Sequence, residues 1–385
     1  MKRKILALCL TIIAVLGLTA CESGFFDIYD STVGSHDSGD NSFGNADGGS
    51  YNVIYNVYEG STTPTDLKTV LKTITPSVVE VYISHNDVLT SAGSGVVVGN
   101  VDDSEIKKSF IITCHHVIEG AAAEDKVIIT TIDGESYYAS FVGSDPDSDI
   151  CVLSIQAVLP PVTYFGDSDK IEVGEDVVAI GNPLGSLGGT VTKGIVSAAS
   201  REITIGGNKM KVIQTDAAVN SGNSGGGLFT ADGYLVGMVN AKYLGTYNSG
   251  VEGLAFAIPS NKIREVTEDL IAYGYIPGKY LLGCTVANYY TSKWGSQGYV
   301  YVTALDFSGS FYQGGLRVGD ILEKMTTYDD DGNATVYDVG MAGAFVEYLN
   351  NLPLKVGQTV KFEIRRGTTQ IILNIEILQY QYGVL

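Results

Sequence analysis

Short apolar runs separated by turn-forming residues dominate this chain, a pattern typical of β-strands. Between residues 66 and 272 the runs are rich in Val, Ile and Thr and alternate with segments of Gly, Asp and Asn. They lie at residues 77–83, 95–98, 110–113, 126–131, 150–155, 177–180, 194–198, 211–214 and 234–241. Many short strands with frequent turns predict a β-barrel or a β-sandwich.

A change of pattern near residue 275 divides the chain. Apolar positions at helical spacing predict a helix at 261–273, with Ser260 as its cap and Gly274 at its end. A second unit follows, with predicted strands at residues 299–304, 321–325, 359–365 and 370–378 and a helix at 341–350. A chain of 385 residues that is 45% apolar can bury two cores.

The N-terminal segment is typical of a targeting signal. Three basic residues precede the apolar run 5–18, which is too short to span a bilayer comfortably and predicts a secretory signal peptide. Leu18-Thr19-Ala20-Cys21 resembles a bacterial lipoprotein signal, which implies cleavage before Cys21 and diacylation of its thiol. A plain signal peptide with an incidental cysteine is the alternative.

Residues 21–63 are rich in Gly, Ser, Asp and Asn and predict a flexible tether with a reach of roughly 35 Å. The expected organisation is therefore a signal peptide at 1–20, this tether, a first domain at 64–275 and a second at 279–385. Such a protein would lie outside the cytoplasm, anchored to a bacterial membrane through Cys21.

Charge and cysteine content exclude few functions. The net charge of −19 argues against nucleic acid or anionic lipid surfaces as partners. Apart from Cys9 in the signal peptide and Cys21, the cysteines are Cys114, Cys151 and Cys284, an odd number that allows at most one disulfide.

Ser224 is a candidate nucleophile because it lies among glycines, in Asn-Ser-Gly-Asn-Ser-Gly-Gly-Gly-Leu at residues 220–228. Glycines permit a sharp turn and the close approach of a substrate carbonyl to backbone N–H groups. A nucleophilic serine also needs a base. His36 lies in the tether and His85 in a turn, whereas His115 and His116 directly follow a strand that we predict to be buried. A core histidine bonded to a carbonyl is the plain alternative.

A buried carboxylate is needed to orient the base. Among Asp145, Asp147 and Asp149, only Asp149 opens an apolar strand, at the junction of solvent and core. Asp145 precedes a proline and Asp147 lies in the middle of the loop, so both are typical turn residues.

Together these segments resemble the HtrA family of trypsin-like serine proteases. Residues 113–118 are similar to the family's Thr-x-x-His-Val segment, which selects His116 as the base. Residues 145–150 are similar to its aspartate segment and select Asp149, and residues 214–226 are similar to its nucleophile signature around Ser224. The order His, Asp, Ser is that of chymotrypsin-type proteases. The resemblance implies a mainly β fold, a chymotrypsin-like double β-barrel followed by one PDZ domain of the α+β class.

The resemblance also implies a mechanism and partners. Ser224 would form an acyl-enzyme on unfolded extracytoplasmic polypeptides, with an oxyanion hole from the backbone at Gly222, Asn223 and Ser224. It implies no cofactor, no metal and a homotrimer. The acidic segment 329–333 is similar to a calcium loop but lacks the downstream glutamate, so a hairpin turn is the favoured interpretation.

Cys114 departs from the family pattern, which has a small or amide residue there. A thiol nucleophile beside a histidine is one interpretation. A buried free cysteine that acts as a small hydrophobe is favoured, because no glycine loop adjoins Cys114.

The pocket for the substrate residue before the cleaved bond is predicted from Ala218, Val219, Val239 and Asn240. Ala218 is the sixth residue before the nucleophile, which lies at the base of this pocket in trypsin-like folds. An apolar pocket of small to medium size predicts cleavage after Val, Ala or Ile and poor cleavage after Lys or Arg.

Residues 298–304 and 314–322 resemble a PDZ domain. Such domains bind peptide C termini by β-augmentation, with loop amides holding the carboxylate. The corresponding loop here contains Leu281, Leu282, Gly283 and Cys284. An alternative function is therefore a PDZ-dependent chaperone or binding protein whose protease site is inactive by default.

Overall fold

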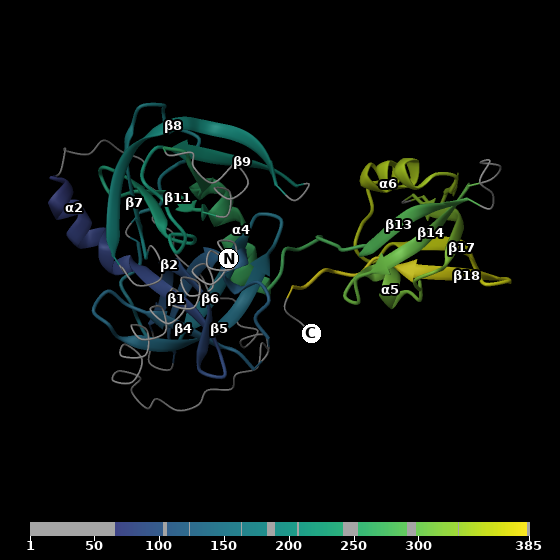
Figure 1. Cartoon of the computed structure of the whole chain (residues 1–385), viewed down its shortest axis with the longest axis horizontal. Coiled ribbons are helices and arrows are strands. Elements are labelled where there is room, and N and C mark those ends of the chain that lie inside the picture. The colour runs from purple at the N-terminus through teal and green to yellow at the C-terminus, as the bar shows by residue number, and fades with distance from the viewer. Residues whose placement is uncertain are drawn as a thin grey trace, which may run out of the picture. The chain divides into compact units, whose positions relative to one another are not determined.

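The computed structural model describes residues 66–382 except 103–105, 123, 163, 183–188, 206–207, 242–252, 291–297 and 330. The chain divides into two compact units between Ala272 and Tyr273. The first unit contains two closed barrels, and the second contains one sheet with helices packed on it (Figure 1). Among the residues described, no helix has the length and apolar character needed to cross a membrane.

The first barrel closes in the strand order β1-β2-β3-β6-β5-β4. Its strands are β1 (Val78–His85), β2 (Val88–Asp102), β3 (Lys107–Cys114), β4 (Lys126–Thr130), β5 (Ser136–Asp145) and β6 (Ile150–Ile155). Helix α2 (Leu67–Ile74) and the 3₁₀ helix η1 (Thr75–Ser77) precede it, and the short helix α3 (His115–Ile118) follows β3. Branched side chains such as Ile111, Ile129 and Leu153 are fully buried in it, as expected for a small barrel filled by its own side chains.

The second barrel repeats this topology, with the closed order β7-β8-β9-β12-β11-β10. Its strands are β7 (Asp176–Gly181), β8 (Thr190–Ile205), β9 (Asn208–Thr215), β10 (Gly227–Thr230), β11 (Leu235–Val239) and β12 (Ala255–Pro259). Helix α4 (Ser260–Tyr273) follows β12 and buries Ile263, Val266 and Leu270. The closed barrels confirm the predicted double-barrel fold.

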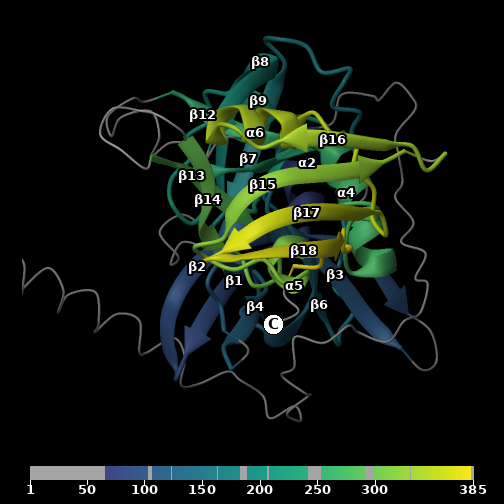
Figure 2. The same ribbon diagram turned by 90° about the vertical axis from the view of Figure 1, so that its right-hand side faces the viewer.

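The second unit is an α+β structure with strand order β13-β14-β15-β17-β18, and β16 pairs with β15. Its elements are β13 (Cys284–Tyr290), β14 (Gly298–Leu305), α5 (Ser310–Gln313), β15 (Ile321–Tyr328), β16 (Ala334–Asp338), α6 (Ala342–Asn350), β17 (Thr359–Arg366) and β18 (Thr369–Glu376). Figures 1 and 2 show α6 and α5 on opposite sides of this unit. Phe311, Phe345 and Phe362 are completely buried between sheet and helices.

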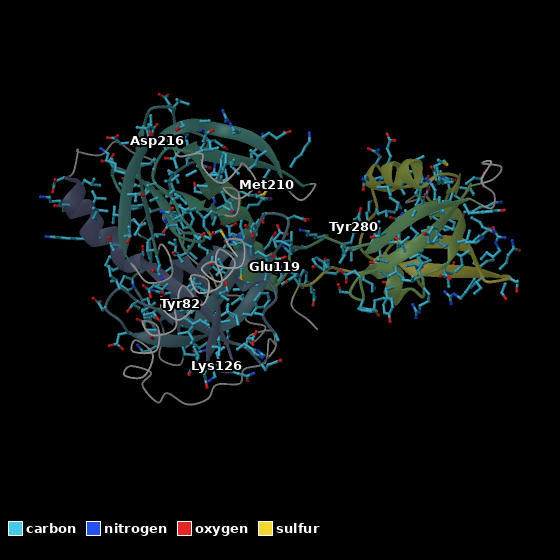
Figure 3. All side chains as sticks on the ribbon, in the orientation of Figure 1. Tyr82, Glu119, Lys126, Met210, Asp216 and Tyr280 are labelled. Carbon is cyan, nitrogen blue, oxygen red and sulfur yellow. The ribbon has the colours of Figure 1, made fainter. Side chains whose placement is uncertain are left out.

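The two barrels meet through hydrogen bonds of the backbone and side chain of Ser94 on β2. Its amide donates to the carbonyl of Ser224 at 2.8 Å, and its hydroxyl donates to the carbonyl of Gly222 at 2.7 Å. Gly225 has a φ of +88°, and a Cβ at this position would collide with the Ser94 carbonyl oxygen. Asn182 of the second barrel donates to the hydroxyl of Tyr82, a first-barrel residue labelled in Figure 3. The loop that carries Ser224 is thus built directly against β2.

The predicted strands and helices did not include β5, β10, β12, β13 or β16, or helices α2, α3 and α5. Strands β10 and β12 have only four and five residues, and they include a glycine and a proline respectively. They are strands because they pair with β7, β9 and β11, which a local pattern does not reveal.

The contact at Gly225 generates a stability prediction. Gly225→Ala is expected to lower the free energy of unfolding of the first unit by about 2–5 kcal/mol, from left-handed backbone strain and overpacking against Ser94. Gly120→Ala is the matched control, because Gly120 also has a positive φ, +84°, but nothing would lie within 4 Å of its new Cβ. That change should cost about 1–2 kcal/mol. Hydrogen exchange of β3 and β6 peptides at increasing urea measures both losses, and equal losses would contradict the predicted collision.

Candidate active site

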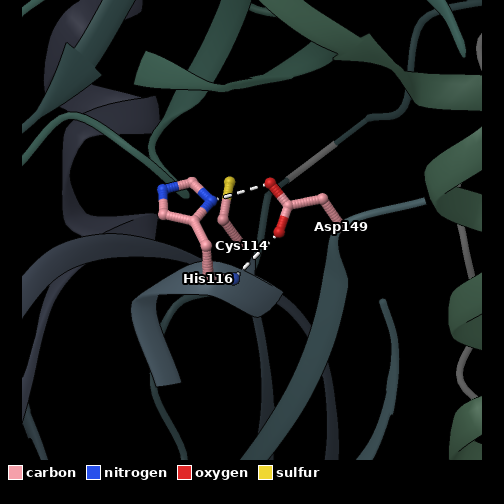
Figure 4. Close-up of side chains that lie close together, drawn as sticks. All are labelled: Cys114, His116 and Asp149. Atoms are coloured by element: carbon pink, nitrogen blue, oxygen red, sulfur yellow. Dashed lines mark hydrogen bonds and ion pairs between the residues drawn. The ribbon is translucent and has the colours of Figure 1, made fainter. Parts of the chain in front are cut away.

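His116 is positioned by the abrupt change from strand β3 to helix α3. Its backbone amide donates to Oδ1 of Asp149 at 2.8 Å, and its Nδ1 lies 2.7 Å from Oδ2 of the same carboxylate (Figure 4). A carboxylate only accepts hydrogen bonds, so the network assigns the proton of the neutral imidazole to Nδ1. Nε2 is therefore left as an acceptor.

Asp149 lies in the tight turn between β5 and β6, in a left-handed conformation with a φ of +56°. Its carboxylate is buried and also accepts a 2.6 Å hydrogen bond from the side-chain amide of Asn240. Burial by itself raises the pKa of Asp149, but the hydrogen bonds and charge attraction from His116, with the bond from Asn240, outweigh it and lower this pKa. Asp149 is therefore ionised at neutral pH.

Ser224 enters the site from the loop between β9 and β10 of the second barrel. Its Oγ lies 2.9 Å from Nε2 of His116 and accepts a 3.2 Å hydrogen bond from the amide of Ala241. Because Nε2 is an acceptor, the Ser224 hydroxyl donates to it. The structure thus brings His116, Asp149 and Ser224 into one hydrogen-bonded chain.

The backbone around Ser224 presents unused donors. The amide of Asn223 closes a turn by donating to the carbonyl of Asn220 at 3.0 Å, so it is committed within the loop. In the described part of the chain the amides of Gly222 and Ser224 donate no hydrogen bond. Two such donors beside a serine hydroxyl have the chemistry of an oxyanion hole.

His115 supports the loop that carries Asp149. Its amide donates to the carbonyl of Asp149 at 3.0 Å, and its Nδ1 lies 2.8 Å from the hydroxyl of Ser144. That hydroxyl donates to the carbonyl of Ile150 at 3.0 Å, so Nδ1 of His115 is the donor to Ser144. His115 and Ser144 therefore fix both sides of the Asp149 turn.

The four residues predicted to line the substrate pocket occupy different environments. Ala218 is exposed and Val219 is half-buried at the edge of the second-barrel core. Val239 is buried within that core, and the side chain of Asn240 is directed at Asp149. The side chains of Ala218 and Val219 are thus the two that remain open to a ligand.

Cys114, the last residue of β3, lies directly beside this chain of groups. Among the residues the structure describes, Cys114, His116 and Asp149 form the one group of three His, Cys, Asp or Glu side chains with metal-ligand atoms within 4.8 Å of each other. The thiol is completely buried and donates to the carbonyl of Val239 at 3.4 Å. The burial of this thiol and the uncommitted amides beside Ser224 favour Ser224 over Cys114 as the nucleophile.

The remaining predicted site residues lie elsewhere. In the second unit, residues 281–283 form the loop before β13, and Cys284 is the first residue of that strand. The carbonyls of this loop accept hydrogen bonds from amides in residues 306–311, whereas the amides of Leu282 and Gly283 donate none within the described residues. Cys21 lies outside the described residues.

Sequence patterns did not reveal that Asn240, Ser94 and Ser144 support the catalytic groups. Asn240 offered a signal, since it is a polar residue at the end of the apolar strand β11. Ser94 and Ser144 offered none, because small polar residues are common in strands and their partners lie 128 and 29 positions away in sequence.

Comparison with known proteins agrees with this geometry. Residues 93–238 match the trypsin-like peptidase domain. The serine protease Do-like HtrA of Lactobacillus helveticus is 36% identical over 301 residues, which cover 74% of this chain and 68% of the relative. The periplasmic serine endoprotease DegP of Escherichia coli is 32% identical, covering 74% of this chain and 57% of DegP. A variant of the HtrA-type protease AlgW, solved with a tripeptide, matches with a TM-score of 0.50 and 29% identity over 82% of this chain and 98% of that structure.

The fold and site therefore define a trypsin-like peptidase. More specifically, the chain belongs to the HtrA/DegP family of serine proteases. It spans about two thirds or less of the length of these curated relatives.

The hydrogen bond from Asn240 to Asp149 predicts an effect on both rate and stability. Asn240→Ala is expected to raise the pKa of Asp149 and to lower kcat about tenfold with little change in KM, because the carboxylate then aligns His116 less well. The loss of stability should be about 1–3 kcal/mol at neutral pH. A lowered carboxyl pKa contributes stability above the unfolded value of about 3.9, and this contribution disappears as the pH falls through the folded value.

Asn261→Ala is the matched control, because Asn261 donates a comparable 2.8 Å hydrogen bond to Asp167 outside the site. This variant should lose some stability and keep its kcat. Steady-state kinetics and urea unfolding from pH 3 to 8 distinguish the two, and an unchanged kcat in Asn240→Ala would contradict the role of Asn240.

Proposed function

We propose that this chain is a serine endopeptidase that cleaves polypeptides through an acyl-enzyme on Ser224. The observation that carries the proposal is the continuous chain from Asp149 through His116 to the Ser224 hydroxyl, with separations of 2.7 and 2.9 Å. The free amides of Gly222 and Ser224 beside it support the same chemistry.

In this mechanism Ser224 Oγ attacks the substrate carbonyl while Nε2 of His116 takes its proton. Asp149 stabilises the imidazolium, and the amides of Gly222 and Ser224 stabilise the oxyanion. His116 then protonates the leaving amine, and a water activated by the same Nε2 releases the acyl group. Asn240, His115 and Ser144 act on this sequence only by holding Asp149.

A binding or chaperone protein with an inactive protease site is the second candidate. In such a resting state we would expect Nε2 of His116 to lie away from the Ser224 hydroxyl, or the amides of Gly222 and Ser224 to donate hydrogen bonds within the protein. The 2.9 Å contact and the uncommitted amides favour the active enzyme.

We assign unfolded polypeptides outside the cytoplasm as substrates. The signal-like N terminus and the periplasmic relatives support this location. The exposed Ala218 and half-buried Val219, with no charge at either position, support cleavage after Val, Ala or Ile.

We assign the second unit as a PDZ domain that binds peptide C termini. Its edge strand β13 is available for β-augmentation, and α6 is linked to it by a 2.8 Å hydrogen bond from the Ala342 amide to Asn288. The unused amides of Leu282 and Gly283 are suited to a terminal carboxylate. Lipid anchoring through Cys21 and assembly into a homotrimer complete the proposal and rest on family resemblance.

The proposed chemistry predicts that Ser224→Ala abolishes cleavage of unfolded casein. It should also abolish labelling by a fluorophosphonate, because the reagent needs the activated hydroxyl. Cys114→Ala is the control for labelling and should still react. Cleavage by the Ser224→Ala protein would contradict the assignment, and a profile of cut sites dominated by Lys or Arg would contradict the proposed pocket.

The PDZ assignment predicts recognition of a free terminal carboxylate. A fluorescent peptide ending in an apolar residue should bind at least tenfold more tightly than the same peptide with a C-terminal amide, because the loop amides lose a charged acceptor. Fluorescence polarisation measures both affinities. Equal binding of the two peptides would exclude the carboxylate loop at residues 281–284.

A further inference from the structure

Cys114 brings a thiol to the active site that the proposed mechanism does not use. Its Sγ lies beside the hydrogen bond between His116 and Asp149 (Figure 4). The contact with the Val239 carbonyl, at 3.4 Å, keeps this thiol directed between the barrels. The side chain of His116 is 16% exposed, so the group is not sealed from solvent.

These donors match the preferences of zinc. A thiolate, an imidazole and a carboxylate are the usual ligands of Zn²⁺, at about 2.0–2.3 Å from the metal. Tetrahedral ligand atoms at those distances lie roughly 3.3–3.7 Å apart. The three donors already lie within 4.8 Å of each other, and the 2.7 Å pair His116 Nδ1 and Asp149 Oδ2 must separate by less than roughly 1 Å.

Charge and softness also favour zinc over other cations. A thiolate and a carboxylate neutralise Zn²⁺ within a largely buried site, which avoids an unpaired buried charge. Magnesium and calcium prefer oxygen ligands, whereas a thiolate selects softer metals.

We propose that Cys114, His116 and Asp149 form an inhibitory zinc site, an inference that rests on the proposed protease function. The imidazole proton moves from Nδ1 to Nε2 of His116, the Cys114 thiol loses its proton to solvent, and zinc binds Nδ1, the thiolate and the carboxylate of Asp149. A neutral imidazole bound to a metal through Nδ1 carries its proton on Nε2, so this atom becomes a hydrogen-bond donor. The base can no longer accept the Ser224 proton, so bound zinc stops acylation.

Zinc titration of the full chain in detergent tests the proposal through casein cleavage. Each protein is normalised to its own rate without zinc, and EDTA should restore that rate. Cys114→Ala removes the thiol ligand and leaves a small side chain. It should raise the zinc concentration for half-inhibition at least tenfold. A half-inhibition concentration unchanged from wild type in this variant would overturn the site.

Two matched variants should keep the wild-type response. Cys151→Ala removes a second buried cysteine of the same barrel, whose thiol pKa is raised by burial. His85→Ala removes a partly exposed histidine that pairs with the buried Asp125. If either variant lost its sensitivity to zinc while Cys114→Ala kept the wild-type sensitivity, the inhibitory zinc would bind at another site.

Cobalt binding tests the site without relying on proteolysis. Ser224→Ala protein that also carries Cys151→Ala and Cys284→Ala keeps all three proposed ligands. On addition of Co²⁺ it should develop a thiolate-to-cobalt absorption band in the near ultraviolet, and adding Cys114→Ala should remove the band. Absence of the band would overturn the metal site. If the band appears but the wild-type chain does not cleave casein, the proposed function is overturned while the metal site is retained.

Discussion

The backbone of Gly225 lies against the carbonyl of Ser94, and this contact between the two barrels governs the rest of the site. Three hydrogen bonds converge there, from the Ser94 amide and hydroxyl to the Ser224 loop and from Thr113 to the Ser94 carbonyl. Thr113 lies three residues before His116 on β3. The same small region of backbone therefore sets the position of the nucleophile relative to the strand that carries the base. A side chain at residue 225 would separate them.

Electrostatics add a second constraint, because the site keeps a charged carboxylate in a buried place. Desolvation raises the pKa of Asp149 and so favours its neutral form, and a neutral acid would neither hold the Nδ1 proton nor stabilise an imidazolium. Hydrogen bonds from His116 and Asn240 reverse that tendency. Asn240 belongs to the second barrel and Asp149 to the first, so docking of the barrels also keeps the acid ionised. Docking of the two barrels therefore both positions the catalytic groups and helps to keep Asp149 ionised.

The same closeness explains why Cys114 matters. A cysteine at the end of β3 would be an ordinary core residue if it pointed into the first barrel. Here its thiol faces the second barrel and the carbonyl of Val239, next to the imidazole and the carboxylate. Three soft or charged ligands thus lie together on the Nδ1 side of His116, where the proposed mechanism needs a proton. A metal that prefers this donor set competes with the proton on His116.

The sequence by itself determined the strand-rich character, the division near residue 275, and Ser224, Asp149 and the pair His115 and His116 as candidates, from which family resemblance selected His116. These follow from local order, since short apolar runs, a glycine-rich loop and a carboxylate at a strand start are visible within a few residues. Resemblance to a known family then supplied the double barrel. Only the tertiary structure showed that Asn240 donates a hydrogen bond to Asp149. It also showed that His115 and Ser144 form hydrogen bonds on both sides of the Asp149 turn, and that the thiol of Cys114 faces the site. Those contacts join residues up to 125 positions apart. They depend on barrel closure and docking, which bring distant strands together and are not encoded in the order of neighbouring residues.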